Sequence, residues 1–76
     1  MSKLGQELTF SLEGNPYIEL NKLLKLMSVV NSGGEAKMII RDGQVIVNEE
    51  VELRLRRKMI PKDLVSIDDI SIVITE

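Results

Sequence analysis

The segment from Ser32 to Asn48 constrains the fold most, because it contains a helix start, a helix end and a strand within a short stretch. Ser32 and Glu35 fit a capping box, in which each side chain accepts a hydrogen bond from a backbone N–H at the helix start. Apolar residues then recur at helical spacing and predict a buried stripe of Ala36, Ile39 and Ile40. Gly43 can end the helix in a left-handed conformation, and residues 44–47 form a β-rich run. We therefore expect a short helix followed directly by a strand.

The flanking sequence predicts the rest of an α+β domain over residues 1–76. Apolar and polar residues alternate over residues 8–12, as in a strand with one buried face. Asn15 as cap and Pro16 as first residue predict a first helix over residues 16–27. Further strands are expected at residues 50–53, 64–67 and 70–75, with turns at 48–49, 61–63 and 68–69 and with Met59 and Ile60 in the core. This order predicts two packed helices on one side of a small, mainly antiparallel sheet.

Composition narrows the chemistry available to the chain. It has no cysteine and no histidine, so thiol nucleophiles, thiolate metal sites and the commonest general base are missing. The acidic pairs Glu49–Glu50 and Asp68–Asp69 fall in predicted turns, where carboxylates usually face solvent. We therefore expect no enzyme activity, no cofactor and no metal. The chain has no apolar run long enough to span a bilayer and no signal-peptide pattern at its N-terminus, so we expect a cytoplasmic protein that does not bind membranes.

Charge is unevenly distributed along the chain. The net charge is −2, yet residues 54–58 carry four cations and no acid. Lys37 and Arg41 lie one helical turn apart, away from the apolar stripe. Arginine and lysine side chains suit phosphate oxygens, which makes both groups candidates for binding a polyanion. Two other interpretations remain open: the helical cations are only a solvated face, or acids at 49, 50 and 52 neutralise the 54–58 run.

Three motifs resemble the S4 (alpha-L) RNA-binding domain. They are Leu20-Asn21-Lys22-Leu23-Leu24-Lys25-Leu26, then Ser32-Gly33-Gly34-Glu35-Ala36-Lys37, then Ile40-x-x-Gly43-x-Val45-x-Val47-Asn48. The resemblance covers about residues 15–67 and is closest to small stand-alone bacterial S4-like proteins of the YbcJ/YaaA type. It implies a fold in which two helices pack on a sheet and the helical pair faces structured RNA.

The resemblance also implies which residues contact RNA. In the general family they map to Lys22, Ser32, Lys37 and Arg41, and the stand-alone branch adds Arg54, Arg56 and Lys58. Arg57 extends that run, and Lys25 lies one turn from Lys22 on the same predicted helix. Glu19 and Gly33 stand where the family often has arginine, and Glu49 replaces the glycine of a Val-Asn-Gly turn.

These observations predict a non-catalytic, monomeric protein that recognises structured RNA, such as ribosomal or transfer RNA, with duplex DNA a less favoured ligand. Phe10 and Tyr17 are the only aromatic residues. So few rings argue against a surface that stacks single-stranded bases. The alternative is a protein–protein adaptor that docks an acidic partner through residues 54–58.

Overall fold

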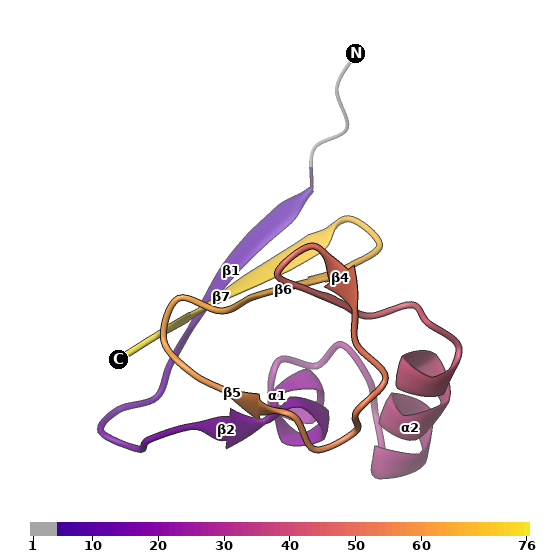
Figure 1. Ribbon diagram of the computed structural model, residues 1–76, viewed down its shortest axis with the longest axis horizontal. Coiled ribbons are helices and arrows are strands. Elements are labelled where there is room, and N and C mark those ends of the chain that lie inside the picture. The colour runs from indigo at the N-terminus through magenta and orange to yellow at the C-terminus, as the bar shows by residue number, and fades with distance from the viewer. Residues whose placement is uncertain (1–4) are drawn as a thin grey trace.

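The computed structural model describes residues 5–76; residues 1–4, part of the stretch judged to lack a signal-peptide pattern, lie outside it. Within residues 5–76, two helices and seven strands follow one another (Figure 1). The elements are β1 (Gln6–Ser11), β2 (Ile18–Glu19), α1 (Leu20–Leu26), α2 (Gly33–Arg41), β3 (Ile46–Val47), β4 (Glu50–Val51), β5 (Lys58–Met59), β6 (Leu64–Ile67) and β7 (Ile70–Thr75). Neither helix is long and apolar enough to cross a membrane.

Five strands form one mixed sheet in the order β1-β7-β6-β3-β4. All neighbours are antiparallel except β1 and β7, which run parallel with Leu8 opposite Ile72. Strands β6 and β7 have the bounds that the sequence predicts, and a two-residue turn joins Ile67 to Ile70. Strands β2 and β5 pair separately as a small antiparallel ribbon.

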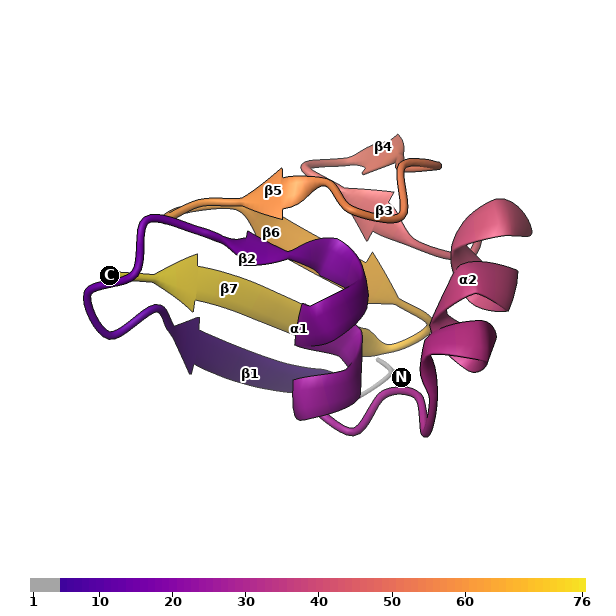
Figure 2. The ribbon, with the colours of Figure 1, turned by 90° about the horizontal axis from the view of Figure 1, so that it is seen from below.

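Both helices lie on the same side of the five-stranded sheet, as predicted (Figures 1 and 2). The core forms between them and the inward-facing residues of β6 and β7. Its fully buried large side chains are Leu20, Leu23, Leu24, Ile40, Val45, Met59, Val65, Ile72 and Ile74. Alternation along β7 puts Ile72 and Ile74 in this core and leaves Val73 on the opposite face.

Helix α2 begins and ends where the sequence predicts. The Ser32 hydroxyl accepts a hydrogen bond from the Glu35 N–H at 3.1 Å. The Glu35 carboxylate accepts one from the Asn31 N–H at 2.7 Å, one residue before the N–H of a standard capping box. Gly43 has a φ of +79°, the left-handed conformation that follows a helix.

The predicted start of the first helix is wrong. Helix α1 begins at Leu20, and Asn15 does not cap it; its side-chain amide donates to the Leu12 carbonyl at 3.0 Å instead. Residues 18–19, predicted as helical, form β2. The reason is a long-range contact: the N–H groups of Leu20 and Asn21 donate to carbonyls of residues 57 and 55. These bonds satisfy the helix start without a local cap.

Two smaller predictions need correction. The strands around the turn at 48–49 are shorter than the predicted 44–47 and 50–53, because pairing is limited to Ile46–Val47 and Glu50–Val51. Asn48 and Glu49 both have positive φ, as in a type I′ hairpin turn. Met59 is buried as expected, but Ile60, the residue that follows β5, is half exposed.

Candidate nucleic-acid interface

The basic segment, residues 54–58, lies against the start of α1. The N–H of Leu20 donates to the Arg57 carbonyl at 2.8 Å, and the N–H of Asn21 donates to the Leu55 carbonyl at 3.1 Å. Strand β5 then pairs with β2, with Lys58 opposite Glu19. These backbone bonds hold the segment in a fixed position although most of its side chains face solvent.

A buried acid organises the basic segment from within. The Glu52 carboxylate accepts hydrogen bonds from Arg54 Nε (2.9 Å), Arg54 Nη2 (3.1 Å), the Arg54 N–H (3.0 Å) and Arg57 Nη1 (2.9 Å). The side-chain bond from Arg54 is the main cause that lowers the pKa of Glu52 from 4.5 to about 2, against the opposing effect of burial. Glu52 is therefore ionised at neutral pH and neutralises part of the run, as one interpretation of the sequence anticipated.

Arg54 and Arg57 differ in how accessible their side chains are to a ligand. The Arg57 side chain is only 24% exposed and lies 3.8 Å from the buried carboxylate of Asp63 as well as bonding to Glu52. The Arg54 side chain is 72% exposed despite its bonds to Glu52. Arg57 is thus mainly part of the internal network, whereas Arg54 keeps a surface that a ligand can contact.

Arg56 and Lys58 are cations of the basic segment that remain accessible to a ligand. Both are exposed, and within residues 5–76 neither forms an ion pair. The Lys58 ammonium lies 5.0 Å from the centroid of the Tyr17 ring, within cation–π range. Together with Arg54 and Arg57 they line an open pocket of about 510 Å³.

The cations of α2 adjoin the basic segment. Lys37 and Arg41 are exposed, as predicted, and line a pocket of about 260 Å³ with Ile40 and with Leu53 and Leu55, which flank Arg54. We call the surface formed by Lys37, Arg41, Arg54, Arg56 and Lys58 the basic face. Ser32 is exposed at the other end of α2, where its hydroxyl is already engaged in capping.

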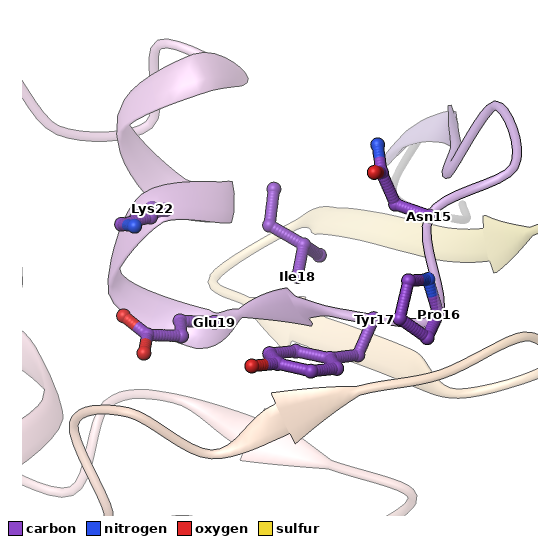
Figure 3. A pocket seen from close by; sticks show the side chains of 6 residues that line it. All are labelled: Asn15, Pro16, Tyr17, Ile18, Glu19 and Lys22. Carbon is purple, nitrogen blue, oxygen red and sulfur yellow. The ribbon is translucent and has the colours of Figure 1, made fainter.

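The remaining predicted residues lie on α1. Lys22 and Lys25 are exposed and line a small surface pocket with Leu26. Lys22 also lines a pocket formed with Asn15, Pro16, Tyr17, Ile18 and Glu19, which we call the Tyr17 pocket (Figure 3). Lys25 lines neither of the two pockets of the basic face, so we leave it out of that surface.

Sequence reasoning missed two contributors, Glu52 and Tyr17. The sequence offers Glu52 only as one of three possible acidic partners, and no local pattern marks it as the buried one. The predicted first helix includes Tyr17, but Tyr17 lies just before β2 with 38% of its surface exposed. The local sequence holds no signal for this, because the steric restriction that a proline imposes falls on the residue before it, here Asn15.

A layer of two helices on one face of a mixed sheet, with a basic segment held against the first helix, defines a small α+β domain of the alpha-L class. The chain belongs to the S4 domain family, whose model matches residues 10–75. This confirms the resemblance found in the sequence.

Two relatives and one solved structure illustrate what the chain is similar to. The Escherichia coli (strain K12) protein named "Putative RNA-binding protein YbcJ" is 47% identical over 58 residues, 76% of this chain and 83% of that protein. The Bacillus subtilis (strain 168) protein named "Probable ribosome maturation protein RlbA" is 41% identical over 51 residues, 67% of this chain and 72% of that protein. The solution structure of E. coli YbcJ, described as revealing an alpha-L motif involved in RNA binding, matches with a TM-score of 0.69 and 39% identity over 100% of this chain and 92% of that one.

Proposed function

We propose that this protein binds structured RNA through the basic face and catalyses no reaction. The observation that carries the proposal is the continuity of the α2 cations with the basic segment, on a chain whose net charge is −2. A concentrated basic surface on an acidic protein favours a specific polyanion over general attraction to anions. The names of the E. coli and B. subtilis relatives support RNA, and ribosomal RNA in particular, as that polyanion.

The geometry favours a folded RNA. The five side chains of the basic face come from a helix and from a segment fixed by backbone bonds, so their spacing is preorganised. Such an arrangement suits phosphates held at fixed positions in a helix or tight loop, which proteins recognise mainly by shape and backbone. Ribosomal RNA is the first candidate, transfer RNA the second, and duplex DNA a weaker competitor. We propose that the protein acts as a monomer.

Binding measured at several salt concentrations tests this proposal. A labelled ribosomal RNA fragment, a transfer RNA and a duplex DNA of similar length are compared by fluorescence anisotropy. Each phosphate neutralised contributes about −0.9 to the slope of log K against log salt for duplexes. We expect RNA to bind more tightly than DNA, with a slope that corresponds to several contacts. No RNA binding even at low salt would refute the proposal.

The ion pairs determine which charge-reversal variants are suitable for this test. Arg56→Glu reverses a cation that has no ion pair within the described residues, and Lys37→Glu does the same on α2. Lys62→Glu is the matched control, because Lys62 is exposed and lines none of the pockets of the basic face. Arg57→Glu, an obvious choice from the sequence, is unsuitable because it would place a second acid beside Glu52.

One observation favours the adaptor as a second candidate. Leu53 is 64% exposed and Met38 57% exposed, and Leu53 lines the pocket between α2 and the basic segment. Phosphates do not need apolar side chains, whereas an acidic, partly apolar peptide segment would use them. Affinity capture with and without ribonuclease separates the two: an RNA binder loses its partners after treatment, and an adaptor keeps them. Leu53→Ser should weaken only the adaptor's contacts.

A further inference from the structure

The Tyr17 pocket lies beside the basic face and has a different chemical character. It has a volume of about 310 Å³, at the lower end of the range typical of small-molecule sites. Figure 3 shows the Tyr17 ring along β2, with Glu19 and Lys22 at the α1 end of the pocket and Asn15 and Pro16 at the other end. An aromatic ring, a carboxylate and an ammonium group therefore line one concave surface.

Tyr17 provides a platform for stacking. It is the only tyrosine of the chain, and it is exposed rather than packed in the core. The Lys58 ammonium lies 5.0 Å from the ring centroid, yet Lys58 is not among the residues that line the pocket. The ring thus borders a cation of the basic face and, elsewhere, an open pocket. One ring cannot make an extended single-strand surface, but it can stack one unpaired base.

Glu19 gives the pocket a preference among bases. It lies opposite Lys58 in the β2–β5 ribbon and one helical turn before Lys22, but within residues 5–76 it forms no ion pair and no side-chain hydrogen bond. A carboxylate repels phosphate, so it is unsuited to contacting the RNA backbone. It accepts hydrogen bonds well, and guanine presents two adjacent donors, N1–H and the N2 amino group, on its Watson–Crick edge. The corresponding edges of adenine, cytosine and uracil each present one donor group.

We propose that the Tyr17 pocket binds one unpaired guanine of the RNA, with the base stacked on Tyr17 and its Watson–Crick edge on Glu19. Lys22 contacts the phosphate of that nucleotide, while the basic face holds the neighbouring folded RNA. The proposal rests on the proposed RNA-binding function and adds base selectivity to it. It also explains why an acid is tolerated where the family often has arginine.

Short single-stranded RNAs test the pocket independently of folded RNA. The probes are four labelled uridine-rich pentamers that differ only in the central base, G, A, C or U, measured by anisotropy at low salt. The chain has one tyrosine and no tryptophan, so quenching of intrinsic fluorescence reports on Tyr17 alone. We expect the G pentamer to bind at least about 5-fold more tightly than the others and to quench Tyr17.

Three variants separate selectivity from charge and folding. Tyr17→Ala should weaken the G pentamer about 10-fold, and Tyr17→Phe should restore it, since the ring is kept. Glu19→Gln should remove the preference for G while binding of the other pentamers stays equal or becomes tighter. If Glu19 is only a repulsive acid, Glu19→Gln tightens all four pentamers equally and the wild type shows no preference, which overturns the proposal.

The outcome for folded RNA is read separately. Folded RNA that binds with wild-type dependence on Arg56, together with pentamers that show no base preference, would refute the guanine site and leave the proposed function standing. Failure of both folded RNA and pentamers at low salt would refute both. Selective quenching by the G pentamer supports the pocket, whatever folded RNA is tested.

Discussion

The clearest stability test concerns Glu52, the buried acid that holds Arg54 and Arg57. Glu52→Gln keeps the side-chain shape and removes the charge. The fall in the Glu52 pKa from 4.5 to about 2 corresponds to at most about 3 kcal/mol of folding free energy. The Arg54 partner is 72% exposed, so solvent screens much of this interaction. We therefore expect Glu52→Gln to lower the free energy of unfolding by about 2 kcal/mol at pH 7.

The effect of Glu52→Gln on the free energy of unfolding should change with pH in a defined direction. Because the pKa of Glu52 is lower in the folded state, its contribution is complete above about pH 4.5 and is lost as pH falls towards 2, where both states become protonated. The difference in unfolding free energy between wild type and Glu52→Gln should therefore shrink over this range. Carboxylates shared by the two proteins titrate in both and cancel in the difference.

Urea denaturation followed by far-UV circular dichroism, from pH 7 to pH 2.5, measures this difference. Glu50→Gln is the matched control, because Glu50 is exposed and has no ion pair within the described residues. Its effect should stay below about 0.5 kcal/mol at every pH. A difference between wild type and Glu52→Gln that does not change with pH would refute the argument, because it would mean that packing rather than charge explains the loss.

The same variant also distinguishes two views of the basic segment in RNA binding. Glu52→Gln removes a negative charge, and this loss alone should strengthen the attraction between the protein and RNA. It also releases Arg54 and Arg57 from their fixed positions, which adds an ordering cost to binding. If preorganisation matters, affinity falls despite the more positive charge; if only charge matters, affinity rises.

Three further predictions concern single positions. Arg56→Glu should weaken RNA binding roughly 10-fold or more and reduce the salt slope by about 1, with an unchanged melting temperature, as anisotropy and thermal denaturation would measure. Glu49→Gly should raise the free energy of unfolding by about 0.5–1 kcal/mol in urea, because Glu49 has a φ of +73°. Asn21→Leu should stabilise by about 1 kcal/mol in the same assay, because the buried Asn21 Oδ1 lacks a hydrogen-bond partner in the described residues.

Each of these has a result that would contradict it. Equal weakening by Lys62→Glu would show that Arg56 acts only through net charge. Glu49→Ala removes the same charge but keeps Cβ, so equal stabilisation by Ala and Gly would assign the effect to charge rather than to backbone conformation. Unchanged or lower stability of Asn21→Leu would show that the amide oxygen has a partner, such as an ordered water.

Local patterns predicted the parts of the fold that local physics decides. The β6–β7 hairpin follows from alternation and a two-residue turn, and α2 follows from its cap and Gly43. The start of α1 could not be predicted in this way, since its N–H groups bond to carbonyls more than thirty residues away. The parallel pairing of β1 with β7 likewise joins the two ends of the described chain.

The same distinction between local patterns and long-range contacts applies to the candidate site. Exposure of Lys37 and Arg41 follows from the helical period, which the sequence contains. The different environments of Arg54 and Arg57 do not follow from it, because both depend on the buried Glu52, whose N–H bonds to the Val45 carbonyl on the other side of the hairpin turn. The position of Tyr17 depends on a similar contact between distant segments, since β2, which begins at the next residue, pairs with β5.

The position of Glu52 resolves an apparent conflict between an acidic chain and a basic face. Four cations within five residues repel one another, and without compensation the basic segment would resist a fixed conformation. An exposed acid could compensate them, but it would also repel a polyanion. A buried acid holds Arg54 and Arg57 from the interior and leaves Arg56 and Lys58 free of ion pairs within the described residues. The charge that a ligand meets at this surface therefore depends on where Glu52 lies, and the net charge of −2 does not describe it.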